Sequence, residues 1–431
     1  MSLFFERPDS GERAVLVHIK LNSESEPEDP REFEELVISA GGDPVEFLTG
    51  SRPSPSAKFF VGSGKLQEIG AVIKSLDAEL VIFNHNLSPS QERNIEAELK
   101  CRVLDRTGLI LDIFAQRART HEGKLQVELA QLQHLSSRLV RGWTHLDREK
   151  GGIGMRGPGE TQLESDRRMV RDRIKTIKQR LEKVRKQRDQ GRRSRTKSEI
   201  PTVSLVGYTN AGKSTLFNKL TSAEVYVADQ LFATLDPTMR RLDVAELGPV
   251  VFADTVGFIS HLPHRLVDAF RATLEEAASS NLLLHVVDAS AEDRAVNIER
   301  VNEVLKEIKA HDLPSLMIYN KIDLLEDMQP HIERDEQGVP IAVWVSALAG
   351  KGMELLLQAV VECLPNKIVH EHIQLQPSQG AFRAALYSQK AVLSEQSVES
   401  GAINLEIKLA ESDFLRLLKN SGLKLQDMVT L

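Results

Sequence analysis

Two apolar stripes with alternating gaps of four and three residues run through the middle of the chain. Stripes this narrow bury little surface except against each other, which predicts two antiparallel helices packed as a coiled coil over residues 121–198. The first stripe consists of Leu125, Leu129, Leu132, Leu139, Trp143 and Leu146, and the second of Val170, Ile174, Ile177, Leu181 and Val184.

The segment between the two stripes, residues 150–160, contains five glycines and one proline and carries Lys150 and Arg156. Such a loop is either a flexible hinge or a probe that inserts into a partner, and the residues alone favour neither. The stretch 190–197 at the end of the second stripe is expected to be a linker.

Residues 12–120 show short apolar runs that alternate with amphipathic stretches, a pattern typical of a small parallel sheet. The expected strands are 14–19, 45–49, 58–61, 80–84 and 102–105, and the expected helices are 31–40, 65–76 and 88–99. The segment Gly62-Ser63-Gly64-Lys65 lacks the spacing of a phosphate-binding loop, and we interpret it as the entry to a helix rather than as a nucleotide site.

After residue 200 the apolar runs resume at 203–206, 250–253, 313–319 and 341–345, with a helix-like stretch at 216–220. Pro365 is expected to close the last helix of this region. Residues 366–431 contain two or three strand candidates, including 404–409, and a helix near 412–420, which indicates a small α+β domain. We therefore predict domains at 1–120, 121–199, 200–365 and 366–431.

Composition narrows the class of protein. At 431 residues, 41% apolar and 27% charged, the chain is expected to form two to four globular domains. It has no run of roughly 18 uncharged apolar residues, so we expect no membrane span, and from the pattern of its first residues we expect no secretory signal. Cys101 and Cys363 are too few for a disulfide framework or a zinc site, which favours the reducing cytoplasm and two ordinary buried thiols.

Charge is distributed unevenly. Residues 167–197 contain fifteen Lys or Arg and three Asp or Glu, a local charge of +12 that leaves −19 for the rest of a chain whose net charge is −7. Three acids cannot neutralise fifteen bases through pairs along the helix, so we expect this helix to contact a polyanion. Without aromatic residues to stack on bases, its contacts would be mostly to phosphates.

The candidate functional residues lie directly after the apolar runs. Residues 207–215, GYTNAGKST, match Gly-x-x-x-x-Gly-Lys-Ser and lie between an expected strand and an expected helix. The glycines let backbone N–H groups and the helix N-terminus point at a polyphosphate. Lys213 would reach the β- and γ-phosphates, and Ser214 would ligate magnesium.

Three further motifs follow later strands. Asp254-Thr255-Val256-Gly257 offers a carboxylate for the magnesium shell and a backbone N–H for the γ-phosphate. In Asn320-Lys321-Ile322-Asp323 the last carboxylate can accept two hydrogen bonds from guanine that adenine cannot donate, so Asp323 selects GTP over ATP. Ser346-Ala347 follows the last strand, at the same carboxyl edge of the sheet as the other motifs.

With these motifs the chain resembles GTPases of the Obg–HflX group, and within it the HflX family, from about residue 12 to about residue 365. The resemblance also rests on residues 232–238, FATLDPT, on 254–259, DTVGFI, and on 151–164, GGIGMRGPGETQLE. It implies a Ras-like P-loop G domain within an overall α/β fold, preceded by an N-terminal α/β unit and a helical hairpin and followed by a small α+β domain.

The resemblance implies GTP hydrolysis to GDP and phosphate, with magnesium held by Ser214 and Thr234 after switch I, residues 224–241, closes on the γ-phosphate. The catalytic residues would be Lys213, Thr234 and Gly257. The expected nucleotide-binding residues are Gly207, Tyr208, Thr209, Asn210, Ala211, Gly212, Lys213, Ser214, Thr215, Phe232, Ala233, Thr234, Leu235, Asp236, Asp254, Thr255, Val256, Gly257, Asn320, Lys321, Ile322, Asp323, Ser346, Ala347 and Leu348.

Two positions depart from the Ras pattern. Phe258 stands where Ras-like enzymes have a glutamine that orients water, so either intrinsic hydrolysis is slow, or a partner or another group supplies the missing element. His261 and His264 lie close by, and we interpret them as switch-surface residues rather than catalysts. Asn210 could help to bind potassium beside the phosphates, although we slightly favour an asparagine that suits an unusual loop backbone.

The leading hypothesis is a cytoplasmic GTPase that binds the large ribosomal subunit and its rRNA, and splits or rescues stalled ribosomes or aids ribosome biogenesis. In this hypothesis the glycine-rich tip is a probe near the peptidyl transferase centre. The free protein would be a monomer that binds no DNA and has at most a peripheral association with membranes. Two alternatives stay open: an ATP- or GTP-driven RNA remodeller with a nucleotide site in the N-terminal unit, and a non-enzymatic RNA-binding adaptor with structural GTP.

Overall fold

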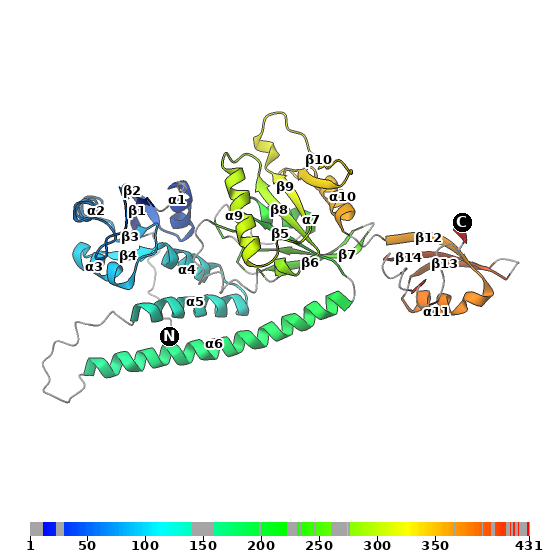
Figure 1. The fold of residues 1–431 in the computed structure, drawn as a ribbon, viewed down its shortest axis with the longest axis horizontal. Helices are drawn as coiled ribbons and strands as arrows, with labels where there is room; N and C mark the ends of the chain where they lie inside the picture. The colour runs from blue at the N-terminus through cyan, green and yellow to red at the C-terminus, as the bar shows by residue number, and fades with distance from the viewer. Residues whose placement is uncertain are drawn as a thin grey trace.

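The structure is a computed structural model of the 431-residue chain. It describes residues 12–22, 30–139, 158–197, 200–221, 231–232, 234–235, 237–244, 247–259, 274, 276–364, 368–389, 391–397, 401–410, 414, 417–418, 421 and 429–430. In this part of the chain the strands form three sheets, and two long helices run beneath the first two of them (Figure 1).

The N-terminal sheet is parallel throughout, with the order β2-β1-β3-β4. Its inner strands are buried on both faces, which explains their continuous apolar runs. The capping box of Ser88 with Gln91 fixes the start of α3. The elements are β1 (Arg13–Leu21), α1 (Pro30–Ser39), β2 (Asp43–Arg52), α2 (Ser63–Leu76), β3 (Leu80–Phe83), α3 (Pro89–Leu99), β4 (Arg102–Asp105) and α4 (Arg106–Arg117).

Two expectations for this domain need correction. Residues 58–61 form no strand, because Phe60 adopts a positive φ of 64° in a tight turn and makes only an isolated bridge with Ser56. Helix α4 was not expected from the sequence. Asp105 starts it by accepting a hydrogen bond from the Gly108 N–H, and five of its apolar side chains contribute to the core between this domain and the next.

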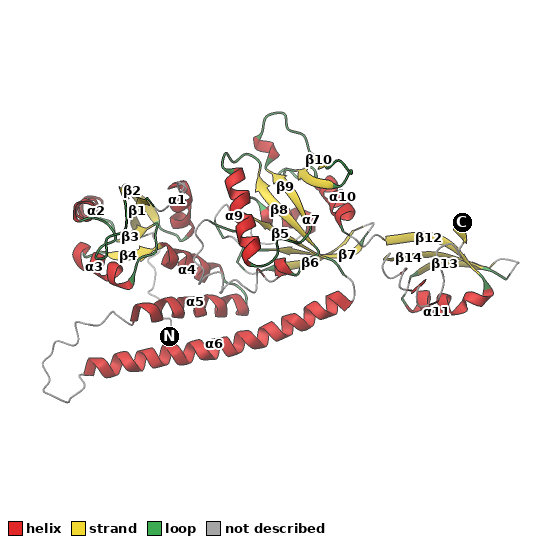
Figure 2. Cartoon of the chain, in the orientation of Figure 1, coloured by secondary structure: helices red, strands yellow, loops and turns green. Residues whose placement is uncertain are grey.

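The expected helical hairpin is present as α5 (His121–Leu139) and α6 (Pro158–Lys197), which lie side by side (Figure 2). Ile177 is fully buried between Leu125 and Leu132, so the two predicted stripes meet. Leu139, Trp143 and Leu146 lie outside the described side chains, as does the tip before residue 158.

The connector predicted at 150–160 and the linker predicted at 190–197 both overlap α6, so the second helix is longer than expected at both ends. Pro158, Gly159 and Glu160 begin the helix instead of ending the connector, which suits the preference of proline for the first helical turn. Residues 190–197 continue the helix rather than forming a linker. A single glycine such as Gly191 costs a helix only about 1 kcal/mol, too little to end one this long.

The central domain is a seven-stranded sheet with the order β10-β11-β9-β8-β5-β7-β6. Its five inner strands are parallel, and the edge strands β6 and β10 are antiparallel to their neighbours. Pro365, expected to close the last helix, lies outside the described residues. The elements are β5 (Thr202–Gly207), α7 (Lys213–Thr221), β6 (Thr238–Val244), β7 (Gly248–Asp254), β8 (Leu282–Asp288), α9 (Arg294–Glu307), β9 (Ser315–Asn320), the short helix η2 (Ile322–Leu324), β10 (His331–Arg334), β11 (Pro340–Trp344) and α10 (Met353–Cys363).

The C-terminal domain is a four-stranded antiparallel sheet with the order β13-β14-β12-β15, so it has more strands than expected. The helix α11 packs on one face of it (Figure 2). Most of the helix expected near 412–420 lies outside the described residues. The elements are β12 (Ile368–Leu375), α11 (Gly380–Ser388), β13 (Val392–Ser397), β14 (Ile403–Ala410) and β15 (Val429–Thr430).

Cys101 and Cys363 are free thiols and are half-buried rather than buried. Within the described helices, none is long and apolar enough to cross a bilayer.

Candidate functional site

The glycine-rich loop of residues 207–212 connects β5 to the first turn of α7. Gly212 has a φ of +88°, and a Cβ there would lie 2.3 Å from Asn320 Nδ2, so the position requires glycine. Lys213 Nζ donates a hydrogen bond to the Tyr208 carbonyl over 2.6 Å, which holds the loop in a closed ring. Burial lowers the pKa of Lys213 to about 8, and an anion bound beside the ammonium would raise this pKa again.

Three oxygen-bearing side chains meet at the end of the loop. Ser214 Oγ lies 2.7 Å from Asp254 Oδ2 and 2.7 Å from Thr234 Oγ1. Asp254 is fully buried, and its Oδ1 accepts no hydrogen bond from the described residues. Burial raises the pKa of Asp254, whereas hydrogen bonds from Ser214 and Thr234 lower it. Hard oxygen donors with a spare buried lone pair are suited to magnesium, so these residues fit the expected ion.

Gly257 closes the phosphate side of the pocket. A Cβ at this residue would lie 2.9 Å from Thr209 Cα and 3.0 Å from Lys213 Nζ. Any larger residue would therefore displace the loop, and glycine leaves the backbone at position 257 open to an anion bound by Lys213.

A second network holds the strand ends at the other side of the pocket. Asn320 is buried, donates from Nδ2 to the Ala211 carbonyl and accepts at Oδ1 from the Ala347 N–H, each over 2.9 Å. It thereby ties the phosphate loop to the segment after β11. Ser346 Oγ donates to Asp323 Oδ1, which orients that carboxylate.

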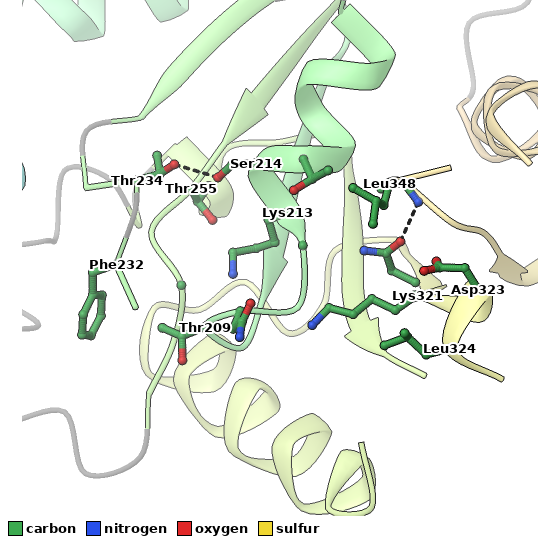
Figure 3. Close-up of a pocket in the computed structure, with 16 residues that line it drawn as sticks. Thr209, Lys213, Ser214, Phe232, Thr234, Thr255, Lys321, Asp323, Leu324 and Leu348 are labelled. Carbon is green, nitrogen blue, oxygen red and sulfur yellow. Dashed lines mark hydrogen bonds between the residues drawn. The ribbon is translucent and has the colours of Figure 1, made fainter. Parts of the chain in front are cut away.

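These parts enclose one pocket of about 400 Å³ (Figure 3). Of the expected residues, it brings together Thr209, Asn210, Gly212, Lys213, Ser214, Thr215, Phe232, Thr234, Thr255, Gly257, Asn320, Lys321, Asp323, Ala347 and Leu348.

Other expected residues support the pocket without lining it. They are Gly207, Tyr208, Ala211, Leu235, Asp254, Val256, Ile322 and Ser346, all buried or half-buried behind the lining. Ala233, Asp236, His261 and His264 lie outside the described residues.

Two contributions were missed. Leu324 lines the pocket with 63% of its surface exposed, and Leu348 lines it with 75% exposed, so each offers apolar surface to a planar base. An exposed leucine directly after Asp323 was the available signal. Glu32 of α1 accepts a hydrogen bond from the Tyr208 hydroxyl, and no local pattern links residues so far apart.

The two departures from the Ras pattern have structural counterparts. Phe258 is 2% exposed and packs in the core rather than reaching toward the phosphates. Asn210 has a φ of +59°, a left-handed conformation that asparagine tolerates better than most residues. This geometry favours the interpretation of Asn210 as a loop residue, and potassium binding stays a prediction.

The turn at 62–65 behaves as a helix entry, because α2 begins at Ser63 and Lys65 forms an ion pair with Glu68 at 2.8 Å. This contact gives no support to a nucleotide site in that turn.

A parallel sheet whose strand ends carry a phosphate loop, an Asp-x-x-Gly and an Asn-Lys-x-Asp around one pocket defines a P-loop GTPase. Comparison with known proteins agrees with this class and narrows it. The chain belongs to the HflX family of GTPases. It therefore hydrolyses GTP, and the hypothesis of a non-enzymatic adaptor is wrong.

Two relatives illustrate the family. GTPase HflX of Escherichia coli (strain K12) is 58% identical over 415 residues, which cover 96% of this chain and 97% of that protein. GTPase HflX of Caldanaerobacter subterraneus subsp. tengcongensis is 47% identical over 81% of this chain and 80% of its own length. A solved GTP-binding protein from Sulfolobus solfataricus in complex with GDP is 27% identical, with a TM-score of 0.43, over 81% of this chain and 97% of that one.

Family models match along nearly the whole chain. They are GTP-binding GTPase N-terminal at residues 28–115, GTP-binding GTPase Middle Region at 117–195, 50S ribosome-binding GTPase at 202–321 and HflX C-terminal domain at 331–427.

Proposed function

We propose that this GTPase acts in the cytoplasm on the large ribosomal subunit, and that GTP hydrolysis drives the splitting or rescue of stalled ribosomes or a step in ribosome biogenesis. The observation that carries the proposal is the cationic surface of α6. Relatedness supports it, because the model matched at residues 202–321 describes a 50S ribosome-binding GTPase.

The cationic surface is formed by Arg171, Lys175, Lys178, Lys183 and Lys186, which line a shallow groove along α6. All five are exposed, and within the described side chains none of the four lysines has an acidic partner within the 4 Å of an ion pair. By contrast, Arg173 and Arg188 of the same helix bind Glu128 and Glu122 of α5. The lysines are therefore available to RNA phosphates, whereas the two arginines join the helices.

The G domain would act as the switch. Ser214 and Thr234 would hold magnesium with the help of Asp254, and the Gly257 N–H would face the γ-phosphate. Magnesium bound there neutralises charge that develops on the transferred phosphoryl group. Lys213 would bind the phosphates, and Asp323 would read guanine. We place the domain limits at 1–120, 121–199, 200–365 and 366–431.

The test is sedimentation with large subunits in the presence of a non-hydrolysable GTP analogue, compared with GDP. Replacing Lys175, Lys178, Lys183 and Lys186 with glutamine should weaken binding. It should also flatten the salt dependence by roughly one unit of slope for each RNA phosphate that the helix no longer neutralises.

The matched control replaces four exposed lysines elsewhere, Lys74, Lys100, Lys306 and Lys309, and changes the net charge equally. It should leave binding and its salt slope unchanged. Equal losses in both variants would mean that α6 has no special role, and the proposal would fail.

The tip is expected to act separately from the helices. Deletion of residues 151–159 should leave binding largely intact while subunit splitting falls, because the helices anchor the protein and the tip perturbs the ribosome. Loss of binding on tip deletion, with no effect of the lysine changes, would reverse these two roles.

A further inference from the structure

The switch I segment is anchored in the N-terminal domain. The Phe232 ring lies 4.7 Å from the Phe114 ring of α4 in an edge-to-face contact, and Phe232 is only 3% exposed. The Leu231 N–H donates a hydrogen bond to Ser39 Oγ of α1 over 3.0 Å. Leu231 and Leu235 are buried in the same core, which joins α1 and α4 to the G domain.

The backbone of this segment is held in an uncommon conformation. Phe232 has a φ of +57°, which bulky residues rarely adopt and which persists only where surrounding contacts impose it. The contacts with Phe114 and Ser39 are of this kind, since both residues are buried and lie in helices of the N-terminal domain.

The anchored segment also carries a residue of the magnesium site. Thr234 follows Phe232 by two positions, and its Oγ1 lies 2.7 Å from Ser214 Oγ. Thr234 is therefore held against the phosphate loop, while Leu231 and Phe232 are fixed to α1 and α4. The position of Thr234 depends on contacts made by a domain that supplies no group to the pocket lining.

A second contact joins the N-terminal domain to the phosphate loop itself. The Tyr208 hydroxyl donates to Glu32, and the Glu32 carboxylate is paired with Arg106 Nη2 at 2.7 Å. Both charged side chains are largely buried, at 16% and 4% exposed. A buried ion pair of this kind has a fixed geometry, so it resists displacement of the loop relative to α1.

We infer that the N-terminal domain positions switch I for the triphosphate, with Phe114 and Ser39 as positioning residues of the GTPase site. The inference rests on the proposed magnesium role of Thr234. GTP contacts a closed switch I through magnesium and the γ-phosphate, whereas GDP has no γ-phosphate to contact. A domain that stabilises the closed switch therefore raises affinity for GTP and leaves affinity for GDP unchanged. By reciprocity, the triphosphate strengthens docking of the N-terminal domain.

The first experiment compares two matched phenylalanines of the N-terminal domain in the full-length protein. Phe114 and Phe83 are both fully buried, but Phe83 packs against Phe60 on the opposite side of the N-terminal sheet. Phe114→Leu should weaken binding of a non-hydrolysable GTP analogue with magnesium about fivefold and leave GDP binding unchanged. Phe83→Leu should change neither affinity.

Equal effects of the two substitutions, parallel losses for analogue and GDP, or no effect of Phe114→Leu would overturn the inference. Circular dichroism verifies that both variants are folded.

A second measurement avoids any change in the core. Ser39→Ala removes one acceptor and no ring, and its matched control is Ser75→Ala on the exposed end of α2. In the wild type, the Leu231 amide should exchange its hydrogen at least about fivefold more slowly with the analogue than with GDP. Ser39→Ala should abolish that difference, and Ser75→Ala should preserve it. Persistence of the difference in Ser39→Ala would contradict the inference.

Thr234→Ala separates this inference from the assignment on which it rests. Where Thr234→Ala loses the preference for the analogue and Phe114→Leu keeps it, the magnesium role stands and the role of the N-terminal domain is wrong. Where Thr234→Ala itself keeps the preference, the magnesium role is wrong and the inference falls with it.

Discussion

Asp323 lies on the β9–β11 side of the pocket, with its carboxylate oriented by Ser346 and flanked by Leu324 (Figure 3). A carboxylate in this position can accept from both the N1–H and the 2-amino group of guanine. Its specificity is chemical rather than steric. An amide at the same place would direct its own N–H donors at the N–H donors of guanine, and no hydrogen bond could form between them.

We predict that Asp323→Asn weakens GTP binding by at least about tenfold and improves binding of xanthosine triphosphate, whose 2-carbonyl can accept from the new amide. Nucleotide titrations with both triphosphates measure the change. Asp327→Asn, at an exposed position outside the pocket lining, is the control and should bind GTP normally. An Asp323→Asn protein with full GTP affinity and no affinity for xanthosine triphosphate would show that this motif does not read the base.

His285 is a second residue whose chemistry depends on its surroundings. It lies in β8 with 3% of its surface exposed, beside a cavity of about 90 Å³ behind the phosphate loop. Burial, reinforced by the charge of Lys213, lowers the pKa of His285 to about 4. The unfolded chain thus binds a proton below about pH 6.5 that the folded protein resists until about pH 4.

We predict that this difference destabilises the folded protein as pH falls from 6.5 toward 4. Between pH 7 and pH 5 the loss should amount to about 2 kcal/mol of unfolding free energy. His285→Leu should remove this contribution, so its free energy of unfolding should fall less between pH 7 and pH 5. Urea unfolding of the nucleotide-free protein at both pH values tests it, with the surface substitution His311→Leu as control. If the wild type and His285→Leu lost the same free energy of unfolding between pH 7 and pH 5, the loss would belong to other groups.

At the scale of elements, the hairpin is held by a narrow seam and by ion pairs at its margin. Ile177 fills the seam against Leu125 and Leu132, and Arg173 binds Glu128 with Nε at 2.6 Å. Helix α6 is 40 residues long, about 60 Å, and packs against another helix over only part of that length. Its rigidity therefore depends on a few buried side chains.

We predict that Ile177→Ala loosens α6 by about 2–3 kcal/mol, because it leaves a cavity in the seam. Amide hydrogen exchange along residues 170–181 should become faster, while GTP affinity should stay unchanged. Met169→Ala, at a side chain that is 65% exposed, is the control and should not alter exchange. Unchanged exchange in Ile177→Ala would mean that the helix is stable without the seam.

At the scale of the whole molecule, the described part of the GTPase site lacks the water-orienting side chain of Ras-like enzymes. Phe258 occupies the position of the water-orienting glutamine and is buried in the core between domains. The described pocket lining contains no glutamine, glutamate or histidine that could take over this role. A partner that completes the site would therefore control the rate.

We predict that saturating large ribosomal subunits raise the rate of GTP hydrolysis at least about tenfold over the free protein. Small subunits alone are the control and should give no comparable increase. A rate that large subunits leave unchanged would remove the partner-assisted mechanism. Exchange of sodium for potassium should add a further increase only if Asn210 takes part in binding the ion.

The sequence by itself determined the features that depend on neighbouring residues. The strand, loop and helix around Lys213 and the seam of the hairpin follow from spacings of a few residues. Hydrophobic periodicity and loop chemistry are local, so they can be read along the chain. Where local signals misled, as at 58–61 and 190–197, apolar runs or glycine suggested boundaries that packing and helix continuity overrode.

Only the tertiary structure decided how the domains act on one another. The bond from Leu231 to Ser39 joins residues 192 positions apart, and the bond from Tyr208 to Glu32 joins residues 176 apart. No periodicity encodes such contacts, because they arise when separately folded surfaces bury their apolar side chains together. The nucleotide site could therefore be predicted from the sequence, whereas the dependence of switch I on the N-terminal domain could be inferred only from the tertiary structure.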